Sequence, residues 1–163
     1  MTEEQKQPSF QIEKIYVKDL SLEIPSGPQA FMQQAQPQLE VQINTAGGQF
    51  ADGYYEVSVS ATVTAKTAER TLFLAEAVQA GIFAVRNVPA DEMDPLLNIG
   101  CPTILFPYLR ETISDLITRG GFPAVLLSPV SFEALYVQRL QQQGGQQPGA
   151  KPQGGEPKIE VAR

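Results

Sequence analysis

The sequence predicts an α+β fold: a four-stranded antiparallel sheet packed on a long helix and a shorter C-terminal helix. Before Pro89, apolar and polar residues alternate over long segments, and after Pro89 the hydrophobic period becomes helical. Short or looped connections join successive strands, which favours antiparallel pairing. A chain of 163 residues has the length of one domain with a buried core.

The most informative segment is residues 10–24, the first predicted strand. Its odd positions are mixed and acidic, whereas its even positions are apolar apart from Lys14 and Lys18. The apolar even positions are Phe10, Ile12, Tyr16, Leu20, Leu22 and Ile24. Strands usually run about 3–10 residues, so this length suggests a sheet that reaches beyond one subunit.

Three further strands are predicted to begin at Leu39, Tyr54 and Thr71, after a long ordered connection over residues 26–38. Gly47-Gly48 suggests a bulge or bend in the first of these strands, and Asp52-Gly53 marks a hairpin turn. The strand from Thr71 is apolar on both faces. Its second face is therefore either covered by a loop of the chain or left exposed as a docking surface.

The helical region begins with a short turn over residues 90–100, and a longer helix follows from Pro102 to Gly120-Gly121. The apolar residues of this longer helix cover more than one face. We expect one side to pack on the sheet and the other, most simply, on another subunit. A second helix is predicted from Ser131, a good N-cap residue, to Gln143.

Composition narrows the class of protein. The net charge is −6, which argues against a protein that binds nucleic acid along its phosphates, and the absence of His removes the commonest general base near neutral pH. The one cysteine, Cys101, can form no disulfide within the chain and is expected to be a structural thiol. We therefore expect no enzyme, no metal and no cofactor.

Both ends of the chain are polar. Residues 1–8 resemble a disordered leader without the basic and apolar regions of a signal peptide, and residues 144–163 are predicted to be a flexible tail. No apolar run approaches the roughly 20 residues needed to span a bilayer. These features predict a cytoplasmic protein.

Several blocks together resemble SecB, the family of bacterial protein-export chaperones. They are FQIEKIYVKDLSLEIP at 10–25, YYEVSVSATVTA at 54–65, LFLAEAVQAGIF at 72–83, NIGCPTILFPYLRETISDLITRGGFP at 98–123 and PVSFEALYVQRLQQQ at 129–143. The resemblance covers most of residues 10–143. The predicted folded domain spans residues 9–143.

The resemblance implies a homotetramer, a dimer of dimers, that holds unfolded secretory precursors and delivers them to the motor protein SecA. By position it implies a SecA-docking face of Asp19, Glu23, Leu74 and Glu76, oligomer packing by Ala75, Ala77 and Gln79, and a client groove of Phe31, Tyr136 and Leu140. Without the resemblance, the carboxylates would be expected to be solvated sheet residues. Tyr136 and Leu140 would be expected to lie in the core with Phe132.

Two other classes of function stay open from the residues alone. One is a carrier protein for a small apolar ligand, which would enclose its ligand between sheet and helices and co-purify with it. The other is an unrecognised enzyme. A holdase instead captures denatured proteins and no folded ones, through several weak apolar contacts that act together.

Overall fold

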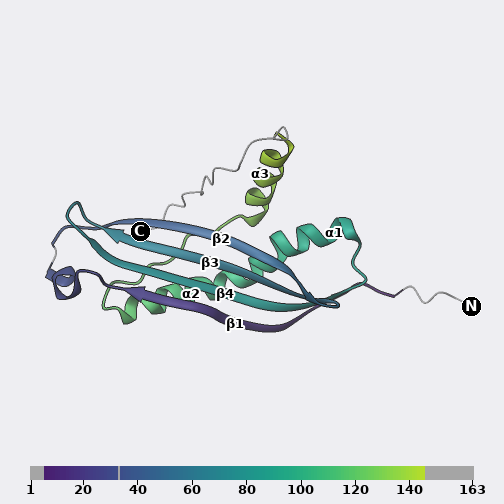
Figure 1. Cartoon of the computed structure of the whole chain (residues 1–163), viewed down its shortest axis with the longest axis horizontal. Coiled ribbons are helices and arrows are strands. Elements are labelled where there is room, and N and C mark those ends of the chain that lie inside the picture. The colour runs from purple at the N-terminus through teal and green to yellow at the C-terminus, as the bar shows by residue number, and fades with distance from the viewer. Residues whose placement is uncertain (1–5, 33, 146–163) are drawn as a thin grey trace, which may run out of the picture.

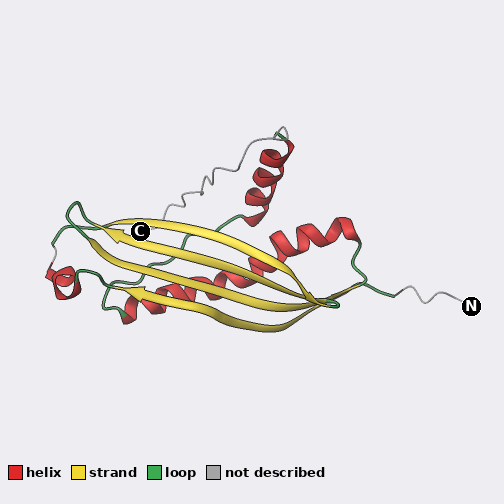
Figure 2. Cartoon of the chain, in the orientation of Figure 1, coloured by secondary structure: helices red, strands yellow, loops and turns green. Residues whose placement is uncertain are grey.

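The computed structural model describes residues 6–32 and 34–145. Four strands form one antiparallel sheet in the order β1-β4-β3-β2, which confirms the predicted fold class. Their bounds are β1 Ser9–Glu23, β2 Gln38–Ala51, β3 Tyr54–Lys66 and β4 Thr71–Arg86. The sheet is long and curved, and the helices lie on one side of it (Figure 1, Figure 2). The opposite side, called here the outer face, is covered by none of the helices formed by the described residues.

Strict alternation in β3 explains which side of the sheet is buried. Val57, Val59, Ala61, Val63 and Ala65 are each no more than 1% exposed, and the residues between them are half-buried. The apolar residues face the helices, and the Ser, Thr and Glu residues between them face outward. Because β3 lies in the middle of the sheet, its partners on both sides are set by the same alternation.

β1 differs from the predicted alternation because its pairing with β4 shifts twice. The register skips Glu13 and Lys18, and each skip moves the following residues to the opposite face. The helix side of β1 therefore carries Phe10, Ile12, Ile15, Val17, Leu20 and Leu22, which are paired with residues on the helix side of β4. Tyr16 lies on the outer face, so its predicted place on the apolar face is wrong.

The bulge predicted at Gly47-Gly48 lies instead at Phe50, which the pairing of β2 with β3 skips. Gly47 keeps the regular register because it lies close to β3: a Cβ there would be 3.2 Å from Val57 Cγ2. The predicted hairpin at Asp52-Gly53 is present, with Gly53 at φ +72°. Such a positive φ suits glycine, which has no Cβ to clash.

The short and long helices predicted after Pro89 form one continuous run. α1 spans Ala90–Pro95, a π-helical turn η2 spans Leu96–Gly100, and α2 spans Cys101–Arg119. The junction residues keep right-handed helical angles, so the chain bends without leaving the helix. Pro95 lies at the end of α1 and Pro102 in the first turn of α2, so the two prolines flank the π turn. Proline has no N–H to donate, which interrupts the regular helical hydrogen bonds there.

Local signals end α2 and begin the last helix. The amide of Phe122 donates to the Ile117 carbonyl and that of Gly121 to the Thr118 carbonyl, with Gly121 at φ +87°. This is the Schellman arrangement that glycine permits. The last helix, α3 Phe132–Gly144, begins where the Ser131 hydroxyl accepts a hydrogen bond from the Ala134 amide, as predicted.

The core lies between the helix side of the sheet and α2. Cys101, Leu105, Leu109, Ile113 and Ile117 line one side of α2 and are fully buried. α3 is anchored by Phe132, whose ring packs edge-on against Phe106 at 5.7 Å, and it extends away from the sheet (Figure 1). Among the described residues, no helix is both long and apolar enough to cross a membrane.

Candidate docking and client-binding surfaces

The four residues predicted to form a docking face lie together on the outer face. Glu23 pairs with Leu74, Ser21 with Glu76 and Asp19 with Val78, in three successive rows of the sheet. Successive rows on one face are two residues apart, about 7 Å. Asp19, Glu23 and Glu76 are exposed and Leu74 is half-buried. We call Asp19, Glu23, Leu74 and Glu76 the acidic docking face.

The carboxylates of this face have no cationic partner within residues 6–32 and 34–145, where the ion pairs involve other acids. An exposed carboxylate on a sheet contributes little to folding. Three of them within about 15 Å create a negative field that attracts a basic surface and steers its approach. The arrangement is therefore suited to docking a basic protein partner.

Beyond Asp19, the outer face carries a cluster that the sequence did not reveal. The Tyr16 hydroxyl donates a hydrogen bond to Glu56 Oε2, and the Lys18 ammonium lies 2.5 Å from Glu56 Oε1. Tyr16 and Lys18 reach across β4 because Ala80, the partner of Tyr16 in β4, has a small side chain. The signal that could have found the cluster is the break in the apolar alternation of β1 at Lys14 and Lys18, since Lys14 directly follows the first skipped residue and Lys18 is the second.

Electrostatics in this cluster follow from these contacts. The Lys18 hydrogen bond, followed by that of Tyr16, holds the pKa of Glu56 below its usual value, so its carboxylate is ionised at neutral pH. The same carboxylate accepts a hydrogen bond from the Tyr16 hydroxyl, which, together with partial desolvation and repulsion of a phenolate, raises the pKa of Tyr16 to about 12. Tyr16 therefore stays a hydrogen-bond donor throughout the physiological range.

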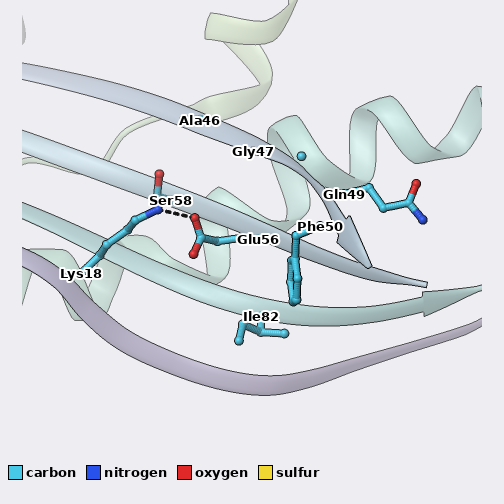
Figure 3. A pocket seen from close by; sticks show the side chains of 9 residues that line it. Lys18, Ala46, Gly47, Gln49, Phe50, Glu56, Ser58 and Ile82 are labelled. Atoms are coloured by element: carbon cyan, nitrogen blue, oxygen red, sulfur yellow. Dashed lines mark hydrogen bonds and ion pairs between the residues drawn. The ribbon is translucent and has the colours of Figure 1, made fainter. Parts of the chain in front are cut away.

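A shallow hollow of about 490 Å³ adjoins the cluster on the outer face (Figure 3). Its floor holds small residues, among them Ala46, Gly48 and Ser58, which explains why the surface is depressed there. Glu56 and Ile82 pair with each other across β3 and β4 and line the middle of the hollow, with Lys18 on one side of Glu56 and Phe50, at the bulge in β2, on the other. The hollow is open to solvent.

The predicted packing residues lie on the opposite side of β4. Ala75, Ala77 and Gln79 are 0%, 1% and 4% exposed, beneath α2 in the same chain. Gln79 Oε1 accepts a hydrogen bond from the Thr112 hydroxyl of α2 at 3.0 Å. The two alanines leave room for the helix to lie close to the sheet, so in a single chain these residues join sheet and helix.

The structure does not bring the three predicted groove residues together in one chain. Phe31, in the short 3-10 helix η1 Gly27–Met32, stacks on Phe122 with ring centroids 5.0 Å apart. Tyr136 of α3 donates a hydrogen bond to Asp94 Oδ2 at 2.7 Å, which raises the pKa of Tyr136. Asp94 and Phe122 lie at opposite ends of the α1–α2 run, which at 1.5 Å per residue is on the order of 40 Å long.

Within the single chain, the three predicted groove residues therefore lie on two separate apolar surfaces. At one end of the molecule, the rings of Phe31 and Phe73 both pack on Phe122, and Phe31 remains 52% exposed. At the other end, Val137 and Leu140 of α3 are each 46% exposed. Phe132, expected on the same helical stripe as Tyr136 and Leu140, is buried.

The structure offers little for other chemistry. Within the described residues, no group of three or more metal-binding side chains comes together. Cys101 is fully buried, and burial raises the pKa of its thiol to about 12. A protonated, inaccessible thiol is a poor nucleophile.

Comparisons with known proteins point to one family. The family model described as "Preprotein translocase subunit SecB" matches residues 3–143. The chain is 56% identical over 144 residues to the protein-export protein SecB of Chromobacterium violaceum, covering 88% of this chain and 96% of that one. It is 53% identical over 143 residues to the protein of the same name from Dechloromonas aromatica, covering 88% and 94%.

The fold is also found in a solved structure. It is that of a SecB-like chaperone from Mycobacterium tuberculosis in complex with a ChAD peptide from an antitoxin. The TM-score is 0.61 with 18% sequence identity, over 74% of this chain and 90% of the other.

Proposed function

Because the chain belongs to the SecB family of protein-export chaperones, we propose that it holds unfolded precursor proteins in the cytoplasm and delivers them to SecA. The observation that carries this proposal is the family match over residues 3–143, which includes every strand and nearly all of α3. The family is one of chaperones and not of enzymes. A holdase needs no chemical step, because binding an unfolded chain is enough to oppose its folding.

Delivery to SecA is assigned to the acidic docking face. Its three carboxylates are exposed and free of ion pairs in the described part of the chain, and the net charge of −6 adds to their field. Leu74 lies in the same row as Glu23 and offers a half-buried apolar contact between the charges. A basic surface with an apolar centre would complement this arrangement.

Client binding is assigned to the two apolar surfaces, one at Phe31 and one along α3. An unfolded chain carries many apolar segments and can contact both surfaces. A tetramer would present each surface four times, so linked weak contacts would give strong overall capture. The finer assignment of Tyr136 and Leu140 rests on their place on α3, where Tyr136 is half-buried and Leu140 is exposed.

Assembly into a tetramer is supported by β1. Phe10, Ile12, Val17 and Leu20 lie on its helix side, yet each is 39–47% exposed in the single chain. β1 is an edge strand, and α2 covers only part of its helix side. Apolar residues aligned along an uncovered edge favour association with another copy.

The carrier alternative has less support. A carrier encloses its ligand, but in the described residues the space between sheet and α2 is filled by side chains with exposures near 0%. The hollow on the outer face is open and lined by polar as well as apolar residues.

The experiment is a SecA-binding titration with a triple variant, Asp19→Asn, Glu23→Gln and Glu76→Gln, which keeps shape and removes charge. We expect SecA affinity to fall at least about tenfold at low salt, with less effect at high salt. Glu133→Gln on α3 makes the same chemical change away from the outer face and should leave affinity unchanged. Equal affinity of the triple and unaltered proteins would refute the assignment.

A further inference from the structure

The Lys18–Glu56 ion pair borders the acidic docking face, and neither of its residues belongs to that face. Lys18 directly precedes Asp19 and is skipped by the pairing of β1 with β4. Its ammonium contacts Glu56 Oε1, and the Tyr16 hydroxyl donates to Glu56 Oε2, so both carboxylate oxygens are engaged (Figure 3 draws the ion pair). Glu56 comes from β3, two strands away from β1.

Charge is unevenly distributed along the outer face. Asp19, Glu23 and Glu76 occupy one end, whereas Lys14 and Lys18 lie beyond Asp19 toward the other. Of the two β1 lysines, Lys18 is the one next to Asp19, whereas Lys66 of β3, at the Leu74 end of the outer face, is paired with Glu40. Without Glu56, its ammonium would offset part of the negative field and repel a basic partner at the border of the docking face.

The neighbouring side chains keep the Glu56 carboxylate ionised and oriented toward Lys18. Lys18 lowers the pKa of the Glu56 carboxyl, so the carboxylate is charged at neutral pH. Tyr16 donates to the second oxygen and fixes the orientation of the carboxylate. The small Ala80 and Ser58 of the adjacent row leave the space over β4 through which the two β1 side chains reach it.

We infer that Glu56 is a specificity-determining residue of the acidic docking face, which neutralises Lys18 and so keeps this face attractive to a basic partner surface. The inference rests on the proposed function, since that partner is SecA. A purely structural ion pair would matter equally through either of its members. A charge-balancing pair instead gives opposite effects when one member or the other is neutralised.

The test compares Glu56→Gln, Lys18→Gln and the double variant in a SecA titration at low salt. One unit charge about 10 Å from several partner charges changes a dissociation constant about two- to fivefold. Glu56→Gln should weaken binding by that factor, and Lys18→Gln should strengthen it. The double variant should return to the unaltered affinity, and all differences should shrink at high salt.

Thermal melts of the same variants establish that each is folded, as expected for an exposed pair. Weaker binding by both single variants, or unchanged affinity in Glu56→Gln, would overturn the inference. The triple variant Asp19→Asn, Glu23→Gln and Glu76→Gln in the same assay tests the proposed function separately from the inference about Glu56. If the triple variant loses SecA and the Glu56 and Lys18 variants do not differ in sign, the proposed function stands and this inference fails.

Discussion

Gln79 of β4 and Thr112 of α2 are joined across the interface between sheet and helix by a hydrogen bond of 3.0 Å. In the described part of the chain, Gln79 is the one polar side chain among the buried residues, at 4% exposure. Its carbonyl oxygen accepts from the Thr112 hydroxyl. The bond therefore ties α2 to one position along β4, which apolar contacts alone define less sharply.

Removing the donor of this bond should destabilise the protein. Thr112→Val leaves the buried Gln79 oxygen without its partner, and we expect a loss of about 1–3 kcal/mol in the free energy of unfolding. Urea melts measure the loss. Adding Gln79→Leu should recover part of it, because no polar group is then left unsatisfied. Thr118→Val, at an exposed site of the same helix, is the control. A Thr112→Val protein as stable as the unaltered one would contradict this account.

The distance between sheet and α2 depends on Gly81. A Cβ at this position would lie 2.8 Å from Phe83 Cε2 and 3.0 Å from Leu105 Cδ2, and both of those residues are fully buried. Gly81→Ala should therefore overpack the core and cost about 1–3 kcal/mol in unfolding free energy. Gly48→Ala is the matched control, since no atom lies within 4 Å of its Cβ position. Equal melting midpoints for the two variants would show that the core accommodates the added methyl group without loss of stability.

The exposed apolar residues of β1 should control assembly. Light scattering after size exclusion is expected to give about four times the 17.8 kDa chain mass. Val17→Lys places a charge on the helix side of β1 and should lower that mass. Gln11→Lys, on the outer face of the same strand, should leave it unchanged. A stable monomer at micromolar concentration, or an intact tetramer in Val17→Lys, would refute this role of β1.

The two apolar surfaces should contribute separately to client capture. Phe31→Ala and Leu140→Ala each remove an exposed apolar contact, and each should weaken capture of an unfolded precursor about fivefold. Because the surfaces are on the order of 40 Å apart, the two losses of binding free energy should add in the double variant. Leu126→Ala removes another exposed apolar side chain and is the control. A double variant no weaker than the single ones would indicate one shared groove.

The phenol of Tyr16 should ionise at a higher pH than an ordinary tyrosine. Its pKa is about 12 in the folded chain, above the usual 10.0, because its hydroxyl donates to Glu56. The stability that this bond contributes is complete below pH about 10 and declines as pH rises toward 12. Ultraviolet titration of tyrosinate should lose one late-ionising group in Tyr16→Phe. Glu56→Gln should shift that group to lower pH. Identical curves for Tyr16→Phe and the unaltered protein would exclude this arrangement.

The sequence alone determined the fold class, the end of α2 and the start of α3, and it predicted the members of the acidic docking face. Alternation in β3 predicted its buried residues because a central strand is paired without interruption over this stretch. Ser131 and Gly120-Gly121 predicted helix ends through contacts that span only a few residues. Asp19, Glu23 and Glu76 were identified through the family resemblance, and they share one face as a consequence of the strand register.

Only the tertiary structure decided the phase of β1 and the neighbours that it acquires. Two skipped residues keep six apolar side chains on the helix side, and the choice of residue depends on the pairing with β4, far away in the sequence. That choice turns Tyr16 outward and brings Lys18 to Glu56, 38 residues further along the chain. The separation of Phe31 from Leu140 could not be predicted from the sequence either. It depends on α1, η2 and α2 forming one long run, which no local signal across Pro95 and Pro102 predicts.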